Sequence, residues 1–219
     1  MNQRGTPPLL VGIAGATGSG KSILAKFLAK RYEGVGALIL EQDSYYRDQS
    51  HLRVEERDSL NYDEPGAIDH ELLLMHIQRL KAGESFLKPI YCFATHTRKP
   101  EGEPVRARPL VLVEGLFSLW YASIRAQLNL KVFVEADSDL RFIRRLRRDV
   151  FERGRTVDSV IAQYLNTVRP MQEVYVLPTK HCADLVVSNN DSLEEPLRQI
   201  SQAISRRLAA LAEQSREAY

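Results

Sequence analysis

Cysteine is scarce in this chain, and long hydrophobic runs are missing. The 219 residues include two cysteines, Cys92 and Cys182, which lie far apart and outside any Cys-x-x-Cys pattern. This usage argues against a disulfide scaffold or a zinc site and suits a reducing compartment. The apolar runs are much shorter than the ~20 residues of a membrane span, and the first one lacks a signal-peptide cleavage pattern. We therefore expect a soluble cytoplasmic protein that does not bind membranes.

Charge of one sign is not in excess either. Lys and Arg number 30 against 28 Asp and Glu, which gives a formal net charge of +2. So small a net charge produces no long-range field that would attract nucleic acid or an anionic surface. Any anion site must be local, and we expect no nucleic-acid partner. The chain is 44% hydrophobic, which is enough for a full core.

A glycine-rich loop near the N-terminus is the most specific motif present. Residues 15–22 follow an apolar run, precede a helical pattern, and match G-x-x-x-x-G-K-[ST]. In this motif the backbone N–H groups surround a phosphate, the lysine reaches the outer phosphates, and the Ser or Thr hydroxyl holds Mg²⁺. The residues predicted to bind nucleotide are Gly15, Ala16, Thr17, Gly18, Ser19, Gly20, Lys21 and Ser22.

Five short aliphatic runs alternate with helical patterns along the chain. The runs, at 9–14, 37–40, 110–113, 131–134 and 185–187, lack polar alternation, which is typical of buried parallel strands. Helical patterns occupy 23–31, 68–82, 139–148 and 157–168, and a last one begins at 193. Alternating strands and helices predict a doubly wound parallel α/β sheet with flanking helices, in a single domain over 1–219.

The long interval between the second and third strands is the irregular part of this pattern. Residues 44–108 include the helix from 68 and a possible β-hairpin around 89–96. A compact domain keeps so long an interval only when it forms a functional insertion. We therefore expect 44–108 to bind the substrate.

Two carboxylates follow predicted strands. Asp43 comes shortly after the second strand, and Glu114 directly follows the third. Ligands of open α/β sheets bind beyond the carboxyl ends of the strands, so both acids should converge on the glycine loop. Glu114 is expected to orient Mg²⁺ together with Ser22. Asp43 is expected to orient an attacking hydroxyl and to accept its proton late in phosphoryl transfer.

An arginine-rich segment covers 141–156. Residues 141–155 hold seven arginines and two acids. Arginine is suited to bidentate phosphate contacts and to neutralising a transferring phosphoryl group. Ile143, Leu146 and Val150 share one helical face, which predicts that they anchor the segment while its arginines project as a lid over the nucleotide.

Taken together, these motifs resemble the uridine kinase (uridine/cytidine kinase) family of P-loop kinases over nearly all of residues 9–188. The resemblance rests on a series of motifs in the family's order. They are the loop at 15–22, Asp-Ser-Tyr-Tyr at 43–46, Asn-Tyr-Asp-Glu-Pro-Gly-Ala-Ile-Asp at 61–69, Pro-Ile-Tyr-Cys-Phe at 89–93 with His96 and Arg98, Glu-Gly-Leu at 114–116, Arg145 with Arg-Asp at 148–149, Glu-Arg-Gly-Arg at 152–155, and Pro-Thr-Lys at 178–180 with Ala-Asp at 183–184.

The resemblance implies roles for individual residues, and it implies ATP (or GTP) as phosphate donor with Mg²⁺. Catalytic roles fall on Asp43 as the base and on Lys21, Arg148 and Arg153 at the phosphates, with Ser22 and Glu114 at the metal. The residues implied around the nucleoside are Asp63 and Arg155 at the ribose, Tyr62, Tyr91 and His96 at the pyrimidine, and Arg145 and Gln163 nearby. The product would be UMP or CMP, in pyrimidine salvage, and the family's habit implies a homotetramer.

Two positions depart from the family pattern. Glu64 stands where the family usually has His, and Cys92 stands where it usually has Asp. We expect the first to alter the ribose end and the second to remove a carboxylate near the base, so the sequence does not predict the choice between uridine and cytidine. The remaining histidines are expected to be exposed polar residues: His51, His70, His76 and His181.

Three other functions share parts of these motifs. A phosphoribulokinase-like or pantothenate kinase-like enzyme would keep the loop, Asp43 and Glu114 but lack the ribose and base contacts. A GTPase switch would use the D-x-x-G match at 63–66, yet no N-K-x-D motif accompanies it. A nucleic-acid-dependent ATPase would need an extended basic surface.

Overall fold

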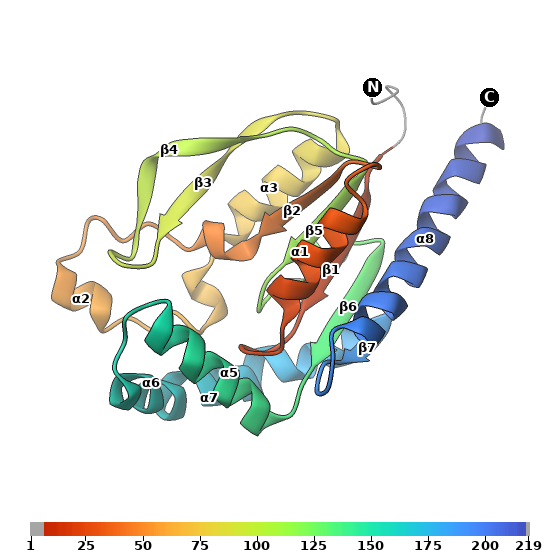
Figure 1. Cartoon of the computed structure of the whole chain (residues 1–219). Coiled ribbons are helices and arrows are strands. Elements are labelled where there is room, and N and C mark those ends of the chain that lie inside the picture. The colour runs from red at the N-terminus through yellow and green to blue at the C-terminus, as the bar shows by residue number, and fades with distance from the viewer. Residues whose placement is uncertain (1–6, 218–219) are drawn as a thin grey trace.

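A five-stranded parallel sheet forms the centre of the molecule, in the order β2-β5-β1-β6-β7 (Figure 1). The computed structural model describes residues 7–217. The strands are β1 (Leu9–Ala14), β2 (Ala37–Glu41), β5 (Leu110–Glu114), β6 (Leu130–Glu135) and β7 (Leu185–Ser188). Each contains one of the predicted aliphatic runs, and all pair in parallel. The predicted doubly wound sheet is therefore confirmed.

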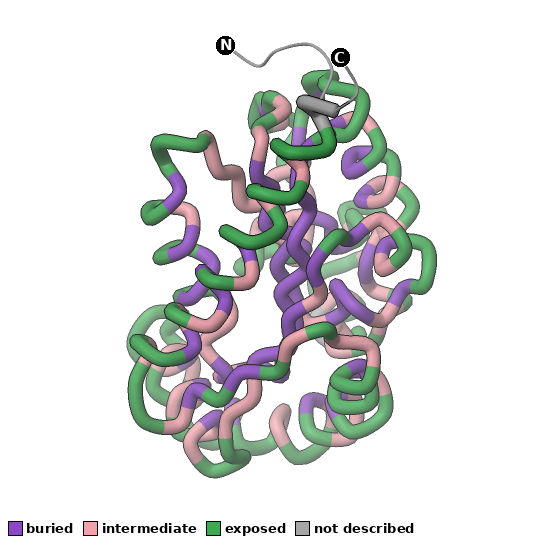
Figure 2. The backbone as a smooth tube through the Cα atoms, turned by 90° about the vertical axis from the view of Figure 1, so that its right-hand side faces the viewer, coloured by how far each residue is buried: buried purple, intermediate pink, exposed green. Residues whose placement is uncertain are grey.

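Helices cover both faces of this sheet. On one face α1 (Lys21–Arg31) and α8 (Glu194–Glu217) bury Leu24, Leu28, Ile200 and Ile204 against the strands. On the other face lie α3 (His70–Lys81) and α4 (Ala122–Arg125). Figure 2 shows the buried residues concentrated between these layers. No helix within residues 7–217 is both long and apolar enough to cross a membrane.

The segment between β2 and β5 contains the predicted helix and hairpin. It begins with the 3₁₀ turn η1 (Gln42–Tyr45), followed by α2 (Val54–Asp58), the 3₁₀ turn η2 (Pro65–Ala67) and α3. The antiparallel hairpin of β3 (Phe86–Cys92) and β4 (Thr97–Val105) then projects away from the sheet (Figure 1). Its strands are longer than expected, and the register shifts between Pro89 and Tyr91.

Below the carboxyl ends of the strands lies a second group of helices. It consists of α5 (Ser138–Phe151) and α6 (Val157–Gln163), which continues through the π turn η3 (Tyr164–Val168), α7 (Arg169–Met171), the π turn η4 (Gln172–Val176) and the 3₁₀ turn η5 (Leu177–Cys182). The expected α-helix over 157–168 therefore becomes π-helical from 164. Pro170 and Pro178 lack the N–H that a regular α-helix requires at those positions, which accounts for the irregular hydrogen bonding nearby.

The predicted anchoring face of α5 is only partly correct, because Leu146 and Val150 are half-buried but the best-buried residues of the helix are polar. Ile143 is 50% exposed, whereas Arg141, Arg145 and Asp149 are buried. Arg141 donates from Nε to the carbonyl of Ala136 (3.0 Å) and from a terminal nitrogen to Gln172 Oε1 (2.6 Å). The helix thus packs through polar groups that have partners, so its apolar periodicity does not identify the buried face.

Candidate active site

The glycine loop connects β1 to α1 at the carboxyl end of the sheet. Gly18 has φ +76°, and a Cβ there would overlap the carbonyl oxygen of Arg141 on α5. Gly20 has φ +90° and immediately precedes the first residue of α1. Asn189, just after β7, donates from its amide to the carbonyl of Ser19 (2.8 Å). The loop is therefore held in the left-handed geometry that directs backbone N–H groups inward.

Glu114 lies under the start of α1, next to both side chains predicted to act there. Ser22 donates its hydroxyl proton to Glu114 Oε1 (2.9 Å), and Lys21 Nζ lies 3.6 Å from the same oxygen. Burial raises the pKa of the Glu114 carboxyl, and Lys21 acts in the opposite direction. Among the described residues, no group of three or more His, Cys, Asp and Glu is arranged to hold a metal ion. A hydroxyl and one carboxylate form a partial oxygen shell, which fits Mg²⁺ that also binds phosphates and water.

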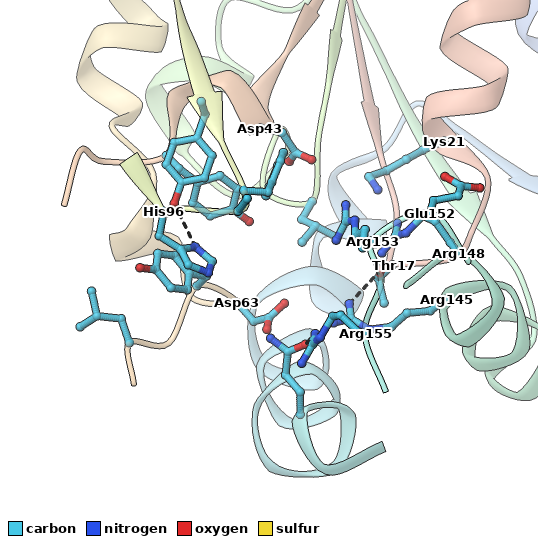
Figure 3. Close-up of a pocket in the computed structure, with 18 residues that line it drawn as sticks. Thr17, Lys21, Asp43, Asp63, His96, Arg145, Arg148, Glu152, Arg153 and Arg155 are labelled. Atoms are coloured by element: carbon cyan, nitrogen blue, oxygen red, sulfur yellow. Dashed lines mark hydrogen bonds between the residues drawn. The ribbon is translucent and has the colours of Figure 1, made fainter. Parts of the chain in front are cut away.

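A cavity of about 650 Å³ opens beside this loop and contains most of the predicted site residues (Figure 3). Figure 3 shows His96 and Lys21 at opposite sides, with Asp43 between them. Asp43 lies on η1, is exposed, and faces this space. The predicted residues that line the cavity are Thr17, Lys21, Asp43, Tyr62, Asp63, Tyr91, His96, Arg145, Arg148, Arg153, Arg155 and Gln163. Ser22, Glu114 and the remaining loop residues lie outside that lining.

Aromatic rings form one end of the cavity. The rings of Tyr62 and His96 stack with centroids 4.2 Å apart, and Tyr91 Oη lies 3.3 Å from His96 Nδ1. Tyr46 packs against Tyr91 at 5.1 Å, and Phe93 lies 5.2 Å from Tyr91. Flat apolar faces next to an imidazole are suited to a planar heterocycle with polar edges.

Asp63 lies at the middle of the cavity floor, near two arginines. Burial raises the pKa of its carboxyl, while the charges of Arg145 and Arg155 and the hydroxyl of Thr167 (3.4 Å) oppose this shift. Gln163 Oε1 accepts hydrogen bonds from Arg145 (2.8 Å) and Arg155. The carboxylate is thus available to accept bonds from vicinal hydroxyl groups, and the arginines beside it are held in place.

The arginines of α5 and the following turn are organised by Asp149, whose side chain is fully buried. Asp149 Oδ1 lies 2.8 Å from Arg148, which also donates from Nε (2.9 Å), and 3.5 Å from Arg153. Asp149 Oδ2 faces Arg145 Nε at 3.4 Å. Three guanidinium groups therefore share one carboxylate at the cavity wall.

Sequence reasoning assigned no role to several residues of this site. Asp149 and Tyr46 belong to motifs that supported the resemblance, so the sequence marked them as motif residues but did not indicate what they do. Thr167, beside Asp63, has no sequence signal of its own. The other lining residues without a predicted role are Leu60, Phe93, Ala94, Leu116 and Glu152.

Cys92 and Glu64, the two departures, do not line the cavity. Cys92 lies at the end of β3, where hydrogen bonds from Thr95 lower the pKa of its thiol. The expected loss of a carboxylate near the base therefore does not affect the cavity lining. His76 also differs from expectation: it is 4% exposed, and its Nδ1 lies 2.9 Å from Tyr45 Oη.

Comparisons with known proteins agree with this arrangement. The chain matches the family described as "Phosphoribulokinase / Uridine kinase family" over residues 10–193. A uridine kinase from Clostridium novyi (strain NT) is 44% identical over 202 residues, which cover 90% of this chain and 97% of that protein. A uridine kinase from Brevibacillus brevis (strain 47) is 47% identical over 180 residues, 82% of this chain and 84% of that protein.

Solved structures show the same fold. Phosphoribulokinase from Rhodobacter spheroides matches with a TM-score of 0.59 at 17% identity, covering 83% of this chain and 70% of that one. At this identity the likeness shows the fold alone, whereas the family match and the two sequence relatives show the family. The chain therefore belongs to the phosphoribulokinase/uridine kinase family and is a kinase.

Proposed function

We propose that this kinase transfers the γ-phosphate of ATP or GTP to the 5′-hydroxyl of uridine or cytidine, giving UMP or CMP. The observation that carries the proposal is one continuous cavity with Lys21 of the phosphate loop at one end, the aromatic and His96 end at the other, and Asp43 between them. Relatives named uridine kinase at 44–47% identity support the same assignment.

At the phosphate end, the loop N–H groups and Lys21 would bind the β- and γ-phosphates. Arg148 and Arg153 line the same cavity, and Figure 3 shows them on the same side of it as Lys21. Phosphoryl transfer depends mainly on positioning and charge neutralisation, so two guanidinium groups at this place are suited to stabilise the transferring group.

Ser22 and Glu114 would hold Mg²⁺. When bound, this ion supplies charge neutralisation at the outer phosphates. The Glu114 carboxylate is 6% exposed, and although Lys21 lies 3.6 Å away, burial and the negative charges of Asp43 and Glu41 raise its pKa, so a divalent cation would further stabilise its charged form.

Asp43 would orient the acceptor hydroxyl and accept its proton late in the transfer. Its exposed carboxylate lines the cavity next to the phosphate end. A carboxylate within hydrogen-bond reach of the nucleophile contributes both to orientation and to general-base catalysis.

At the acceptor end, Asp63 would accept hydrogen bonds from the ribose 2′- and 3′-hydroxyls, with Arg145, Arg155 and Gln163 beside it. Tyr62, Tyr91 and His96 would contact the pyrimidine. A related small-metabolite kinase is not favoured, because an aromatic end of this kind serves no purpose for a sugar phosphate or a small hydroxy acid. A cytoplasmic role in pyrimidine salvage, a tetrameric assembly and a single domain over 1–219 stay predictions.

The test is an ADP-release assay across uridine, cytidine, purine nucleosides, ribulose 5-phosphate, pantothenate and glycerate, with Mg²⁺ and either ATP or GTP. We expect turnover with the two pyrimidine nucleosides, and its abolition in Lys21→Ala. Lys26→Ala, an exposed lysine of the same helix, is the matched control and should retain turnover. Preferred turnover of a non-nucleoside acceptor, or near-normal turnover in Lys21→Ala, would overturn the proposal.

A further inference from the structure

Two of the segments that form the acceptor side of the cavity carry Asp43 and the base-binding hairpin residues. Asp43 belongs to η1, next to the sheet, whereas Tyr91 and His96 belong to the hairpin that projects from it. If a base binds on the hairpin while a hydroxyl of the same molecule reaches Asp43, the distance between the segments must be fixed. Misplacement of about 1 Å can cost a reaction on the order of 10²-fold.

Arg98 on β4 connects these two segments. It pairs across the hairpin with Tyr91. Its Nε donates to the carbonyl of Tyr46 (2.8 Å), and a terminal nitrogen donates to the carbonyl of Tyr45 (3.2 Å). These carbonyls lie at the end of η1, two and three residues after Asp43.

The same guanidinium also binds the start of α3. Both terminal nitrogens of Arg98 donate to Asp69 Oδ2, at 3.3 and 3.2 Å. Asp69 is in turn the N-cap of α3, accepting from the N–H of Leu72 (3.2 Å) through its other oxygen. The Arg98 side chain is 19% exposed, so these charge-assisted bonds are largely shielded from water.

A second contact strengthens the connection. The backbone N–H of Arg98 donates to Asp48 Oδ1 (2.9 Å), so both main chain and side chain of this residue tie the hairpin to the segment after β2. The guanidinium, with five N–H donors in a fixed plane, is suited to bind two consecutive carbonyls and a carboxylate together. Lysine at this position would keep the charge next to Asp69 but lose the fork.

We propose that Arg98 is a positioning residue that fixes the distance between the base-binding hairpin and Asp43, an inference that rests on the proposed nucleoside kinase function. Arg98 does not line the cavity and touches no reacting atom. It acts through η1, by holding the carbonyls of Tyr45 and Tyr46 and thereby the turn that carries Asp43.

The experiment is a double-mutant cycle of Arg98→Lys and Asp43→Asn, with uridine as acceptor. We expect Arg98→Lys to lower kcat about 10- to 100-fold while the KM for ATP stays within about twofold. In the Asp43→Asn background the same change should alter kcat by less than about twofold, because the carboxylate that it positions is already absent. Arg79→Lys is the control: Arg79 also binds a carboxylate and a carbonyl, at Glu84 and Ser85, and should leave kcat unchanged.

Several results would overturn the proposal. If the fold-decreases in kcat caused by the two substitutions multiply in the double variant, Arg98 does not act through Asp43. The same conclusion holds if Arg98→Lys raises the KM for ATP as much as it lowers kcat. If thermal unfolding shows that Arg98→Lys is poorly folded, kcat is measured instead for Arg98→Ala with and without added guanidinium. If guanidinium does not restore any kcat, Arg98 is not a positioning residue. Failure of the kinase function itself would be seen separately, as absent uridine turnover in the unsubstituted protein.

Discussion

Replacing Asp149 by asparagine tests how the arginines of the phosphate end are held. The carboxylate is 0% exposed and lies within 3.5 Å of Arg145, Arg148 and Arg153. Asparagine keeps the shape of the side chain but removes the charge that these three guanidinium groups share. The Arg145 side chain is 7% exposed, so it would become a buried charge with no counter-charge nearby other than Asp63.

The cost in stability follows from this burial. Removing one partner of a buried ion pair costs about 3–5 kcal/mol. Arg148 and Arg153 are 33% and 38% exposed and can recover hydration, so we expect the lower end, about 3 kcal/mol. For a protein of this size that corresponds to a decrease in Tm of roughly 6–12 °C.

Asp149→Asn should lower kcat by more than the loss of folded protein at the assay temperature can explain. An arginine that stabilises a transferring phosphoryl group contributes about 10³–10⁵ in rate, and Asp149→Asn would release Arg148 and Arg153 without deleting them. We therefore expect kcat to fall on the order of 10²-fold, measured by ADP release with ATP and uridine at a temperature where the variant is folded.

The control for this experiment is Asp139→Asn, an exposed acid in the first turn of the same helix. It removes the same charge from α5 without touching the guanidinium cluster, so kcat should stay within about twofold. If Asp149→Asn retained normal kcat and lost only stability, the carboxylate would be a structural ion-pair partner with no role in positioning the arginines.

Three further predictions concern single residues. Asp43→Asn should still bind uridine in calorimetry but lose kcat by ~10²-fold or more, and an unchanged kcat would assign the base elsewhere. His96→Ala should change the uridine/cytidine ratio of kcat/KM more than the KM for ATP; equal changes would argue against a base contact. Burial lowers the pKa of His76 from 6.5 to about 4, so the folded protein binds fewer protons than the unfolded chain between these values. Its contribution to stability should be constant above pH 6.5 and decrease as the pH falls toward 4, by at most about 3 kcal/mol, as seen in urea midpoints. The same slope in His76→Gln would contradict this assignment.

The central strands β5, β1 and β6 could be predicted from sequence because they are largely buried on both faces. All six residues of β1 are buried, and the run is continuously apolar for that reason. The order of motifs likewise placed Asp43 and Glu114 at the carboxyl end, since parallel strands finish at the same edge. These inferences need only the chain direction and the hydrophobic pattern.

The packing of α5 could not be predicted in this way. Its buried residues are Arg141, Arg145 and Asp149, spaced four apart. Arg141 binds Gln172, which is distant in sequence, and Arg145 binds both Thr17 of the glycine loop and Asp149. Periodicity assigns arginine to solvent because desolvating an unpaired charge is costly. The carbonyl, amide and carboxylate groups that offset this cost become visible only once the helix is placed beside the glycine loop.

Cys92 shows how a departure from a family pattern can be misread when position is inferred from neighbours in sequence. Tyr91 faces the cavity, and successive residues of a strand point to opposite sides, so Cys92 points away from it.

The donors around the sulfur of Cys92 are the N–H groups of Ala94 and Thr95 and the hydroxyl of Thr95. An aspartate there would accept the same bonds and close an Asx-type turn, which is a common way of shaping a hairpin end. The residue at position 92 therefore bears on how the turn before His96 is held, and His96 itself, with φ +54°, depends on that turn. Because Cys92 does not line the cavity, we expect it to influence the choice between uridine and cytidine only indirectly, through the placement of Tyr91 and His96.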